Sequence, residues 1–332
     1  MRSIRILLGC FGVFACLVVP GAIAQAQVAT PSGVVSEGVP QFGHVFVIVG
    51  ENTKLNQLTA KHTPWLVKTF KPDAAWLTGY RATGHFSTGN YIAMTSGQFT
   101  RCEQLDNPPS ECHQGVDNVF HQLDVARLPW QEWNESMPSP CYLTDFGASS
   151  TFNSYRVKHN PAVYYDNIEG PGGIFDAANP SAECTSNVIA TGGTGPNDTS
   201  ALDAALASGA VGRFNYIVPN QCEDAHDNCT GPGSRLLQFD AFVKREVPKI
   251  EASPAFGSNG LVAIVFDEAT ASTLYHDGGP VLWAAQGPQV QPGVYSGAFT
   301  HYSFLRTLED GYRLDGYLGF AAGAQPINTI WK

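Results

Sequence analysis

A pattern that occurs three times in this chain constrains its fold more than any other feature. A short apolar run is followed at once by polar side chains, at residues 45–49, 214–218 and 261–266. The polar groups that follow are Glu51-Asn52, then Asn220 with His226-Asp227, and then Asp267-Glu268. Continuous apolar runs of this length are typical of parallel strands that are covered on both faces. Because the carboxyl ends of such strands meet at one edge of a sheet, the pattern predicts an open α/β sheet with a single site there.

The remainder of the chain predicts one large domain over residues 41–332. Of the 332 residues 43% are hydrophobic, which is enough for a sizeable core. Helices are expected at 64–70, 91–96, 201–208, 234–247 and 302–308. Residues 102–199 hold many Pro and Gly residues and little periodicity. We expect them to form a loop-rich insertion that lies over the sheet and is stapled by disulfides.

The N-terminus has the features of a secretory signal over residues 1–26. Arg2 and Arg5 precede an apolar run from Ile6 to Val19, and small residues around Ala24 suit a cleavage site. Residues 27–40 have the composition of a flexible leader. The apolar run is too short to span a bilayer comfortably, and no other long one follows. We therefore expect a secreted or periplasmic protein with no transmembrane segment in the mature chain.

Six cysteines remain after the predicted signal, and an even number in an exported chain predicts disulfides. Although six cysteines allow fifteen pairings, their order suggests Cys102 with Cys112, Cys222 with Cys229, and Cys141 with Cys184. A zinc site is the alternative, but it needs closely paired cysteines of the C-x-x-C kind, which the sequence lacks.

The charge of the chain excludes one class of partner. Only 14% of the residues are charged, the formal net charge is -10, and no run of Lys and Arg occurs. Such a composition does not supply the basic patch that binds nucleic acid or an acidic membrane surface. We therefore expect a small-molecule ligand and a monomer or dimer.

The stretch from Gly84 to Gly97 predicts a serine at the start of a helix. Small and polar residues lead into an apolar segment, and Gly97 follows where a C-cap glycine belongs. This places Ser87 at a helix N-terminus, where unpaired N–H groups and the helix dipole stabilise an oxyanion or phosphate oxygen. Ser87 is therefore either a nucleophile or an ordinary N-cap serine.

Four oxygen-bearing side chains at two strand ends suggest a metal site. Asp267 and Glu268 are adjacent and repel each other in a dry site unless a cation lies between them. With Glu51 and Asn52 they form a hard, oxygen-rich ligand set for a divalent metal. The alternative is that each pair is a surface or capping group, which is the usual role of such residues.

His85, His159 and His226 are the remaining candidates for chemistry. His85 lies two residues before Ser87, and His226 lies in a polar run with Asp227. Both settings suit proton transfer or contact with an anion. His301 equally suits a helix start and the role of His276 is open, whereas His44, His62, His113 and His121 are taken as background.

These motifs, taken in order, resemble one known family. They are Glu51-Asn52 after an apolar strand, His85-x-Ser87-x-x-Asn90-Tyr91, Lys158-His159-Asn160-Pro161, His226-Asp227, Phe266-Asp267-Glu268 and Thr300-His301-Tyr302-Ser303. Together they resemble the bacterial phosphoesterase family that holds non-specific phospholipases C and acid phosphatases, in the alkaline-phosphatase-like superfamily. The resemblance runs from about residue 44 to the C-terminus. It implies a three-layer α/β sandwich with a largely parallel central sheet.

The resemblance also implies roles for individual residues. Ser87 would be the nucleophile and contact one divalent metal ion, held by Glu51, Asn52, Asp267 and Glu268. Asn90 would contact a phosphate oxygen. His159 and His226 would contact phosphate or donate a proton, Asp227 would orient His226, and His85 matches the Gly-His that precedes the nucleophile. The implied reaction is hydrolysis of a phosphoric ester through a phosphoserine intermediate, with Ca, Mg, Mn or Zn as the metal.

The sequence departs from the family pattern at Gly89, which replaces a proline and is expected to loosen that turn. A sulfatase of the same superfamily is disfavoured, because no arginine follows Ser87 in the required setting. The second alternative is a catalytically silent exported binding protein on the same fold. Among substrates, a phosphomonoester, a phosphodiester and a phospholipid all stay open. Aromatic residues between Trp130 and Tyr165 would either line a pocket for the substrate or pack in the core.

Overall fold

The centre of the fold is an eight-stranded sheet with the order β5-β4-β6-β1-β7-β8-β2-β9. We obtained it from a computed structural model that describes residues 36–99, 105–231, 233–270 and 277–332. The predicted signal 1–26 lies outside the described residues, as do Cys102 and His276. The described residues belong to one unit, Val34–Lys332.

The three predicted strands lie side by side at the middle of this sheet. β1 (Val45–Gly50) pairs in parallel with β6 (Phe214–Val218) on one side and with β7 (Leu261–Phe266) on the other. All residues of the three strands are buried. Their continuous apolar sequences are explained by this position, because a central parallel strand is covered on both faces. The prediction of an α/β fold with a largely parallel central sheet is confirmed.

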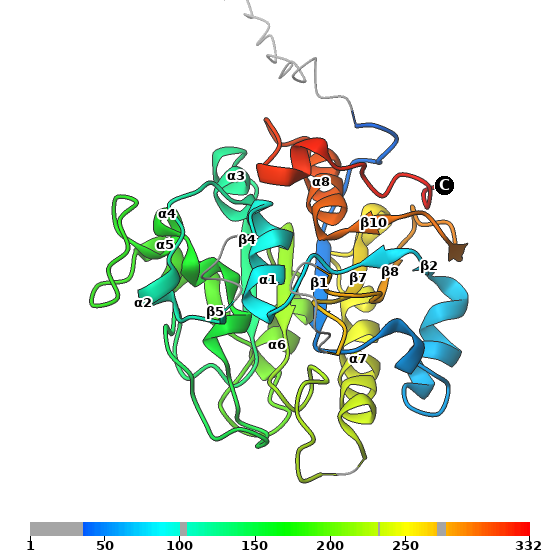
Figure 1. Cartoon of the computed structure of the whole chain (residues 1–332), viewed down its shortest axis with the longest axis horizontal. Helices are drawn as coiled ribbons and strands as arrows, with labels where there is room; N and C mark the ends of the chain where they lie inside the picture. The colour runs from blue at the N-terminus through cyan, green and yellow to red at the C-terminus, as the bar shows by residue number, and fades with distance from the viewer. Residues whose placement is uncertain (1–35, 100–104, 232, 271–276) are drawn as a thin grey trace, which may run out of the picture. The chain divides into compact units, whose positions relative to one another are not determined.

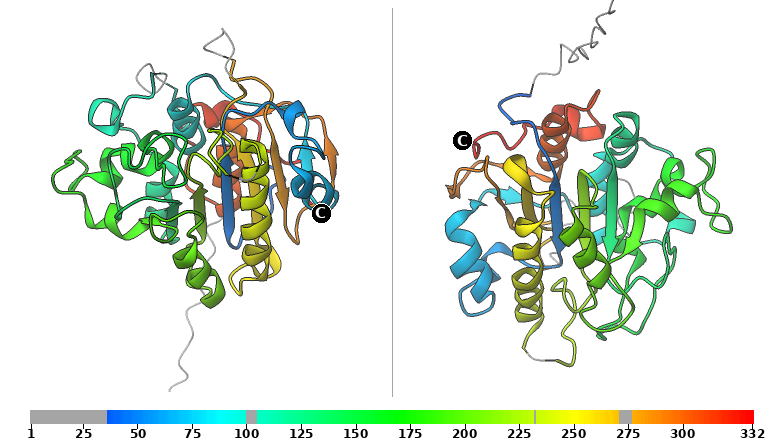
Figure 2. Two further views of the ribbon diagram at one scale, coloured as in Figure 1. Left: turned by 90° about the horizontal axis from the view of Figure 1, so that it is seen from below. Right: turned by 180° about the vertical axis from the view of Figure 1, so that it is seen from behind.

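Helices cover both faces of the sheet. α1 (Ser87–Ser96) and α8 (His301–Tyr312) pack against each other on one face, whereas α6 (Ser200–Ser208) and α7 (Arg235–Ala252) lie on the other (Figures 1 and 2). The predicted helices at 201–208, 234–247 and 302–308 correspond to α6, α7 and α8. The expected helix at 64–70 is a short π-helical turn, Leu66–Phe70.

Two strands that the sequence analysis missed come from residues 102–199. β4 (Trp130–Asn134) and β5 (Val188–Ala190) extend the sheet in parallel beyond β6. β4 is hard to recognise because Glu132 and Asn134 interrupt its apolar pattern although both are fully buried. Trp130 and Trp133 lie on the same strand and are buried, so core packing, and not a substrate pocket, accounts for them.

The predicted leader is too long at its C-terminal end. Val39 is 1% exposed, and the Arg306 side chain donates a hydrogen bond to Glu37 at 2.7 Å. Asn328 also donates to the Glu37 carbonyl at 3.0 Å. The folded unit therefore includes residues before position 41, because α8 and the C-terminal segment hold this stretch.

Two of the three predicted disulfides are present: Cys141 pairs with Cys184, and Cys222 pairs with Cys229. The third prediction involves Cys102, which lies outside the described residues. None of the helices in the described residues has the length and apolar character needed to cross a bilayer.

The remaining elements complete the layers. β8 (Trp283–Gln286) runs antiparallel to β7 and β2, β2 (Ala75–Leu77) pairs in parallel with β9 (Gly293–Tyr295), and β3 (Tyr80–Arg81) forms a separate pair with β10 (Phe299–Thr300). The short helices are α2 (Pro109–Cys112), α3 (Val119–Val125), α4 (Asp166–Glu169) and α5 (Ala182–Asn187).

Candidate active site

Acidic side chains meet where β1, β6 and β7 end. Glu51 follows β1, Asp224 lies six residues after β6, and Asp267 and Glu268 follow β7. The backbone joins these segments, because the Glu51 amide donates to the Asp224 carbonyl at 2.7 Å and the Asp267 amide donates to the Gly50 carbonyl at 2.9 Å. The prediction that the strand ends form one site is therefore consistent with the geometry.

Ser87 is the first residue of α1 and is 1% exposed. Its hydroxyl donates a hydrogen bond to Glu51 Oε2 at 3.1 Å. Asn52 also donates to Glu51 Oε2, from Nδ2 at 3.0 Å, and its backbone amide donates to Asp267 Oδ1 at 3.1 Å. The structure thus places Ser87, Glu51, Asn52 and Asp267 together, as predicted.

The turn before Ser87 is fixed by Asn90. The Asn90 Oδ1 atom accepts from the amides of Thr83 and Gly84, and its Nδ2 donates to the carbonyls of Gly84 and Phe86. Both amide protons are therefore used within the turn. Asn90 orients the segment that carries Ser87, and the predicted contact with a phosphate oxygen has no support in this geometry.

Gly89 lies inside α1 and not in the turn before it, and the loosening of that turn stays a prediction. It is the third residue of α1, and a Cβ atom at this position would lie 2.5 Å from the Phe99 ring. The glycine therefore allows an aromatic side chain to pack against the start of the helix. α1 ends as predicted at Gly97, which has a left-handed backbone with a φ of 69°.

Several buried polar atoms in this cluster lack a hydrogen-bond partner within the described residues. They are Glu51 Oε1, Asp224 Oδ2, Asp267 Oδ2 and His159 Nε2. Burial raises the pKa of Asp267 well above its usual value, and the charges of Glu51 and Glu268 raise it further. Burial likewise raises the pKa of Glu51 and of Asp224. Burying unpaired carboxylates is costly, so the cluster needs protons or a cation.

Glu268 pairs with the histidine that precedes the serine. His85 Nδ1 contacts Glu268 Oε2, and both side chains are almost fully buried. Burial raises the pKa of Glu268 to about 7, although the bond to His85 lowers it. His301 supports the neighbouring turn, because its Nε2 lies 2.5 Å from the Asp267 carbonyl oxygen and its Nδ1 lies 2.9 Å from the Tyr80 hydroxyl. His301 is therefore a structural residue at the start of α8.

His159 lies inside the acidic cluster. Its Nε2 is 3.3 Å from Glu51 Oε1 and its Nδ1 is 3.5 Å from Asp224 Oδ2. Its ring stacks on Tyr91, with centroids 5.4 Å apart. Burial lowers its pKa well below the usual value, and the charge of Lys158 adds to this. A lowered pKa makes an imidazole less able to carry a proton to the leaving group, so of the two predicted donors the structure favours His226.

His226 is more accessible and is held in place by two carboxyl groups. Its Nδ1 lies 2.7 Å from Asp227 Oδ1, and its backbone amide donates to Asp224 Oδ1 at 2.6 Å. Its ring centroid is 5.9 Å from that of His159. Asp227 thus orients His226 as expected. Asp227 also accepts from Ser150, so a direct role in binding substrate is not indicated.

The sequence analysis missed three residues that shape this site. Asp224 was present in the motif around His226 but received no role. Tyr91 packs on His159, and its buried hydroxyl has no hydrogen-bond partner in the described part of the chain. Arg235 donates to the Asn52 carbonyl at 3.2 Å and to Thr53 Oγ1 at 2.9 Å. A signal for Asp224 existed in its position after β6, whereas nothing local in the sequence pointed to Arg235.

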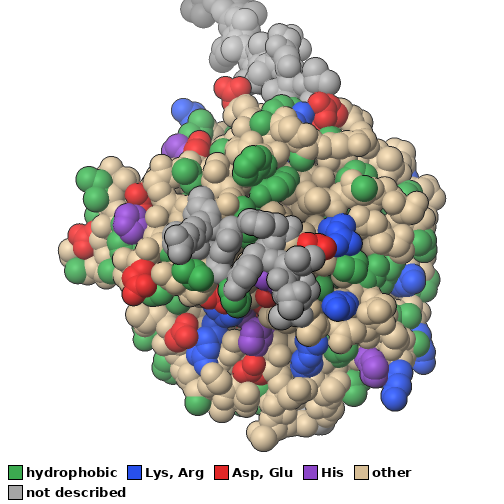
Figure 3. Space-filling model, in the orientation of Figure 1, with side chains coloured by type: hydrophobic (Ala, Val, Ile, Leu, Met, Phe, Trp, Pro, Cys, Tyr) green, Lys and Arg blue, Asp and Glu red, His purple; other side chains and the backbone are tan. Residues whose placement is uncertain are grey.

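The donor set has the chemistry of a site for a hard cation. The orphaned carboxylate oxygens of Glu51 and Asp267 are the kind of ligands that divalent metals take from proteins. Within the described residues, however, no group of three or more His, Cys, Asp or Glu side chains is positioned to hold a metal ion as it stands. The residues fit a cation by type, and side-chain rotations would be needed to complete the ligand sphere. Charged and histidine side chains gather near the middle of the face shown in Figure 3.

Comparison with known proteins now identifies the family. Residues 44–315 match the sequence profile of the Phosphoesterase family. The chain belongs to this family. This Phosphoesterase-family chain is 24% identical over 328 residues to a phosphatidylinositol-3-phosphatase of Mycobacterium tuberculosis, covering 96% of this chain and 95% of the relative. It is also 24% identical to an acid phosphatase of Aspergillus fumigatus, covering 94% of this chain and 64% of the relative.

Solved structures give the same fold. The Phosphoesterase-family chain superposes on a protein of the alkaline phosphatase superfamily from Vibrio parahaemolyticus with a TM-score of 0.56 and 12% identity, over 88% of this chain and 73% of that one. It superposes on the lipoteichoic acid synthase LtaP from Listeria monocytogenes with a TM-score of 0.54 and 12% identity, over 88% of this chain and 78% of that one. At this identity the likeness shows the alkaline-phosphatase-like fold alone. The family identifies the chain as a hydrolase of phosphoric esters and disfavours a silent binding protein.

Proposed function

We propose that this protein is an exported, metal-dependent phosphatase that acts through a phosphoserine intermediate on Ser87. The observation that carries the proposal is the position of the Ser87 hydroxyl, which donates to Glu51 at the point where buried carboxyl groups converge. An ordinary N-cap serine would hydrogen-bond its own helix. In the structure Phe86 is the N-cap residue of α1, so Ser87 is the first helical residue and not the capping serine, and its hydroxyl donates to Glu51 just after β1.

The first step is attack of Ser87 Oγ on phosphorus. As the new O–P bond forms, the hydroxyl proton passes to Glu51 Oε2, which already accepts the Ser87 hydrogen bond at 3.1 Å. The start of α1 directs the positive end of the helix dipole toward the same place, where it stabilises the phosphate oxygens. The Thr88 amide in this first turn already donates to Asp106 Oδ1 at 3.0 Å. The bond from phosphorus to the leaving oxygen breaks in this step.

His226 supplies the proton that the leaving alcohol needs. The Asp227 carboxylate at 2.7 Å fixes the His226 ring through Nδ1, which leaves Nε2 as the nitrogen for proton transfer. Water then attacks phosphorus and gives a proton to His226, which lost its own to the alcohol; the Ser87–phosphate bond breaks, the proton on Glu51 returns to Ser87 Oγ, and inorganic phosphate is released. His159 is buried and its pKa is lowered by that burial, so it serves as a spacer between Glu51 and Asp224.

A divalent metal would be held by Glu51, Asn52, Asp267 and Glu268, with Ser87 beside it. When bound, such an ion screens the charge of phosphate and lowers the pKa of a coordinated hydroxyl. What supports this part of the proposal is the set of orphaned carboxylate oxygens in a buried cluster. The metal identity stays open among Ca, Mg, Mn and Zn, because the ligand types suit each of them.

The substrate belongs to the phosphoric esters, and a phosphomonoester is the form that we propose. The named relatives are phosphatases and act on monoesters by name. Export is supported by the two disulfides, since such bonds persist in oxidising compartments. Cell fractionation of the full chain tests export, and a cytoplasmic product with reduced cysteines would contradict it.

The experiment that tests the function is a substrate panel assayed with and without a chelator. The panel consists of an aryl phosphate, a bis-aryl phosphate and a phosphocholine ester. We expect turnover of the aryl phosphate, loss of turnover with chelator, and recovery when metal is returned. Rapid quenching with a radiolabelled phosphate ester should trap phosphate on Ser87. Activity that resists chelation would remove the metal from the proposal, and an unlabelled Ser87 would remove the covalent intermediate.

A further inference from the structure

A buried carboxyl group that the chemistry above does not use anchors the loop that carries His226. Glu135 follows β4 directly and is 1% exposed. Its Oε2 accepts a hydrogen bond from the Asn220 backbone amide at 3.0 Å. Asn220 in turn begins the loop, since its carbonyl accepts the Asp224 amide at 2.8 Å. We call residues 220–229 the acid loop, and Glu135 fixes the position of its first residue.

The acid loop is short and closed on itself. A disulfide between Cys222 and Cys229 joins its two ends. Inside it, the His226 amide donates to Asp224 Oδ1 at 2.6 Å. Because these links restrain the loop to move as one unit, a shift of Asn220 would also displace the His226 ring.

A second buried carboxyl group, that of Glu223, faces Glu135 from the acid loop. The two Glu223 oxygens accept from the Arg245 guanidinium at 3.1 Å and 2.7 Å. The Glu223 carboxyl group also lies within hydrogen-bonding reach of the Glu135 carboxyl group. Two ionised carboxylates have acceptors only, so a bond between these groups requires that one of them carries a proton.

The charges around this pair show which carboxyl group holds the proton. In the described part of the chain, the network contains more acids than bases: it consists of Arg245 and Lys249 with Glu135, Glu223, Glu246 and Asp203. Each of these acids except Glu135 has an ion pair with one of the two bases. Glu135 is therefore the carboxyl group without a balancing charge, and a proton in place of that charge keeps it neutral.

The hydrogen bonds of Glu135 agree with this assignment. Its Oε1 is buried and has no partner within the described residues when the group is counted as ionised. Burial raises the pKa of Glu135 well above its usual value, and the charge of Glu223 raises it further. A proton on Oε1 would donate to Glu223 and would leave Oε2 free to accept the Asn220 amide.

We propose that Glu135 is a positioning residue for the general acid, because its protonated carboxyl group joins Glu223 to Asn220 and so holds the acid loop with His226 at the leaving oxygen. Glu135 acts only through the acid loop. This inference rests on the proposed function, since it concerns the proton that His226 delivers.

The test compares Glu135→Gln with Glu135→Leu on two phosphate esters. A glutamine keeps both hydrogen bonds, because its oxygen accepts the Asn220 amide and its NH₂ group donates to Glu223, whereas a leucine keeps neither. On an alkyl phosphate, Glu135→Leu should lower kcat about tenfold with KM nearly unchanged, since a displaced acid loses much of its contribution. On 4-nitrophenyl phosphate, whose leaving group needs no proton, kcat should fall less than about twofold. Glu135→Gln should keep the wild-type kcat on both.

The matched controls are Glu132→Gln and Glu132→Leu. They make the same changes at another buried carboxyl group, on β4, whose described partners are Asn134 and the Ala162 amide. Any general loosening of the strand would affect both esters alike. The ratio of kcat on the alkyl ester to kcat on the aryl ester should therefore equal the wild-type ratio in both controls.

Infrared spectroscopy detects the proton itself and does not depend on activity or on Glu135→Leu folding. At neutral pH, where an ordinary glutamate is ionised, the difference spectrum between wild type and Glu135→Gln should contain the C=O band of a protonated carboxyl group. Absence of that band would overturn the shared proton. Equal losses on the two esters in Glu135→Leu, or a Glu135→Gln enzyme as slow as Glu135→Leu on the alkyl ester, would overturn the positioning role. If the wild type hydrolyses neither ester, the proposed function fails instead.

Discussion

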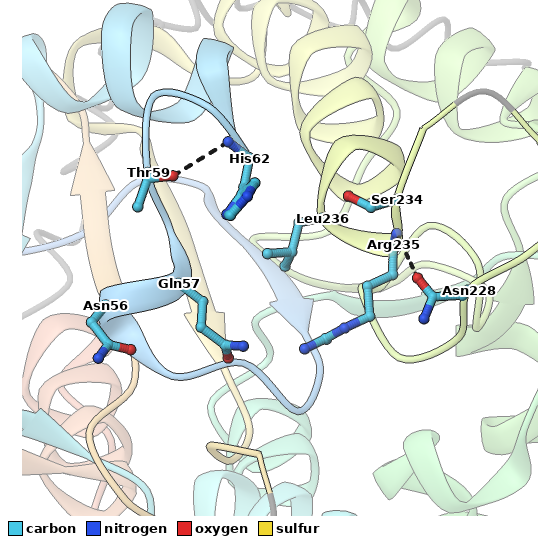
Figure 4. Close-up of a pocket in the computed structure, with 8 residues that line it drawn as sticks. All are labelled: Asn56, Gln57, Thr59, His62, Asn228, Ser234, Arg235 and Leu236. Atoms are coloured by element: carbon cyan, nitrogen blue, oxygen red, sulfur yellow. Dashed lines mark hydrogen bonds between the residues drawn. The ribbon is translucent and has the colours of Figure 1, made fainter.

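Two neighbouring regions of this molecule treat charge in opposite ways. In the site, Glu51, Asp224, Asp267 and Glu268 are buried together, and several of their oxygens have no hydrogen-bond partner within the described residues. In the cavity beside it, between residues 56–62 and the start of α7 (Figure 4), the described lining residues carry no carboxyl group; Arg235 there donates to uncharged oxygens while the charges of Asp224 and Glu51 act on its guanidinium. The first region holds carboxyl groups that protons or a cation would balance, whereas the charge of Arg235 in the second is already offset by Asp224 and Glu51. The comparison teaches that Arg235 compensates part of the acidic region from beside it.

The largest effect is expected from loss of the nucleophile. Ser87→Ala should lower kcat on aryl phosphate by about 10⁴-fold or more, because the covalent step is removed. The fold should persist, since the hydroxyl makes one described hydrogen bond. Steady-state kinetics and thermal melting check both points. Ser96→Ala, at the other end of α1, is the matched control and should keep its activity. Near-native turnover of Ser87→Ala would exclude this serine as the nucleophile.

The next effect concerns the cation that we propose for the acidic region. Asp267→Asn should lower the metal content and reduce kcat by about 10³-fold, because one charged ligand is lost from a buried site. Elemental analysis of purified protein and titration with added metal measure the change. Asp310→Asn alters a buried carboxyl in α8 that accepts from Tyr317 instead, and it should retain metal. An Asp267→Asn protein with full metal content would show that this carboxylate does not bind the ion.

A smaller effect is expected at the boundary between the two regions. His226→Asn should lower kcat by about 10²-fold on an alkyl phosphate, whose leaving oxygen needs a proton. On 4-nitrophenyl phosphate the loss should be less than about tenfold, since that leaving group departs as an anion. Comparing the two substrates separates proton donation from binding. Equal losses on both would argue against His226 as the acid. The control is His121→Asn, an exposed residue paired with Asp117.

The smallest effect on turnover is expected from a buried carboxyl outside both regions. Burial raises the pKa of Glu132 to about 8 from a usual value of 4.5. The folded state therefore holds this proton more tightly than the unfolded chain does. The stabilisation that results is complete below about pH 4.5 and declines as the pH rises toward 8. Glu132→Gln should leave kcat unchanged and remove this decline, which amounts to a few kcal/mol at most.

Chemical denaturation of wild type and Glu132→Gln at several pH values measures this difference. The variant should gain stability relative to the wild type between about pH 4.5 and 8. Glu132 has neutral partners, since it accepts from Asn134 and from the Ala162 amide. Parallel stability curves for the two proteins would mean that Glu132 stays ionised. An ionised Glu132 would show that this fold can bury a carboxylate without a metal, so burial alone would not argue for a metal at the site.

Much of the site was predictable because the end of a continuous apolar run marks the end of a buried strand. Glu51, Asn52, Asp267 and Glu268 follow strands whose sequences are apolar throughout, and parallel strands deliver such residues to one edge. Ser87 was predictable from the residues around a helix start. Strand β4 was not predicted, because Glu132 and Asn134 are buried with each other as hydrogen-bond partners. In the sequence, a polar pair of this kind has the pattern of exposed residues, and only the fold shows that it is buried.

The sequence by itself determined the central strands, the start of α1 and the group of residues that meet at the strand ends. These follow from local hydrophobic pattern and backbone preference, which act over a few residues. Only the tertiary structure decided that Asn90 holds a turn, that burial lowers the pKa of His159, and that Arg235 links Asn52 with Ala225. These properties depend on burial and on partners far away in the chain. Burial and hydrogen-bond partners of this kind are set when the chain packs, because packing removes water from some polar groups and leaves others hydrated.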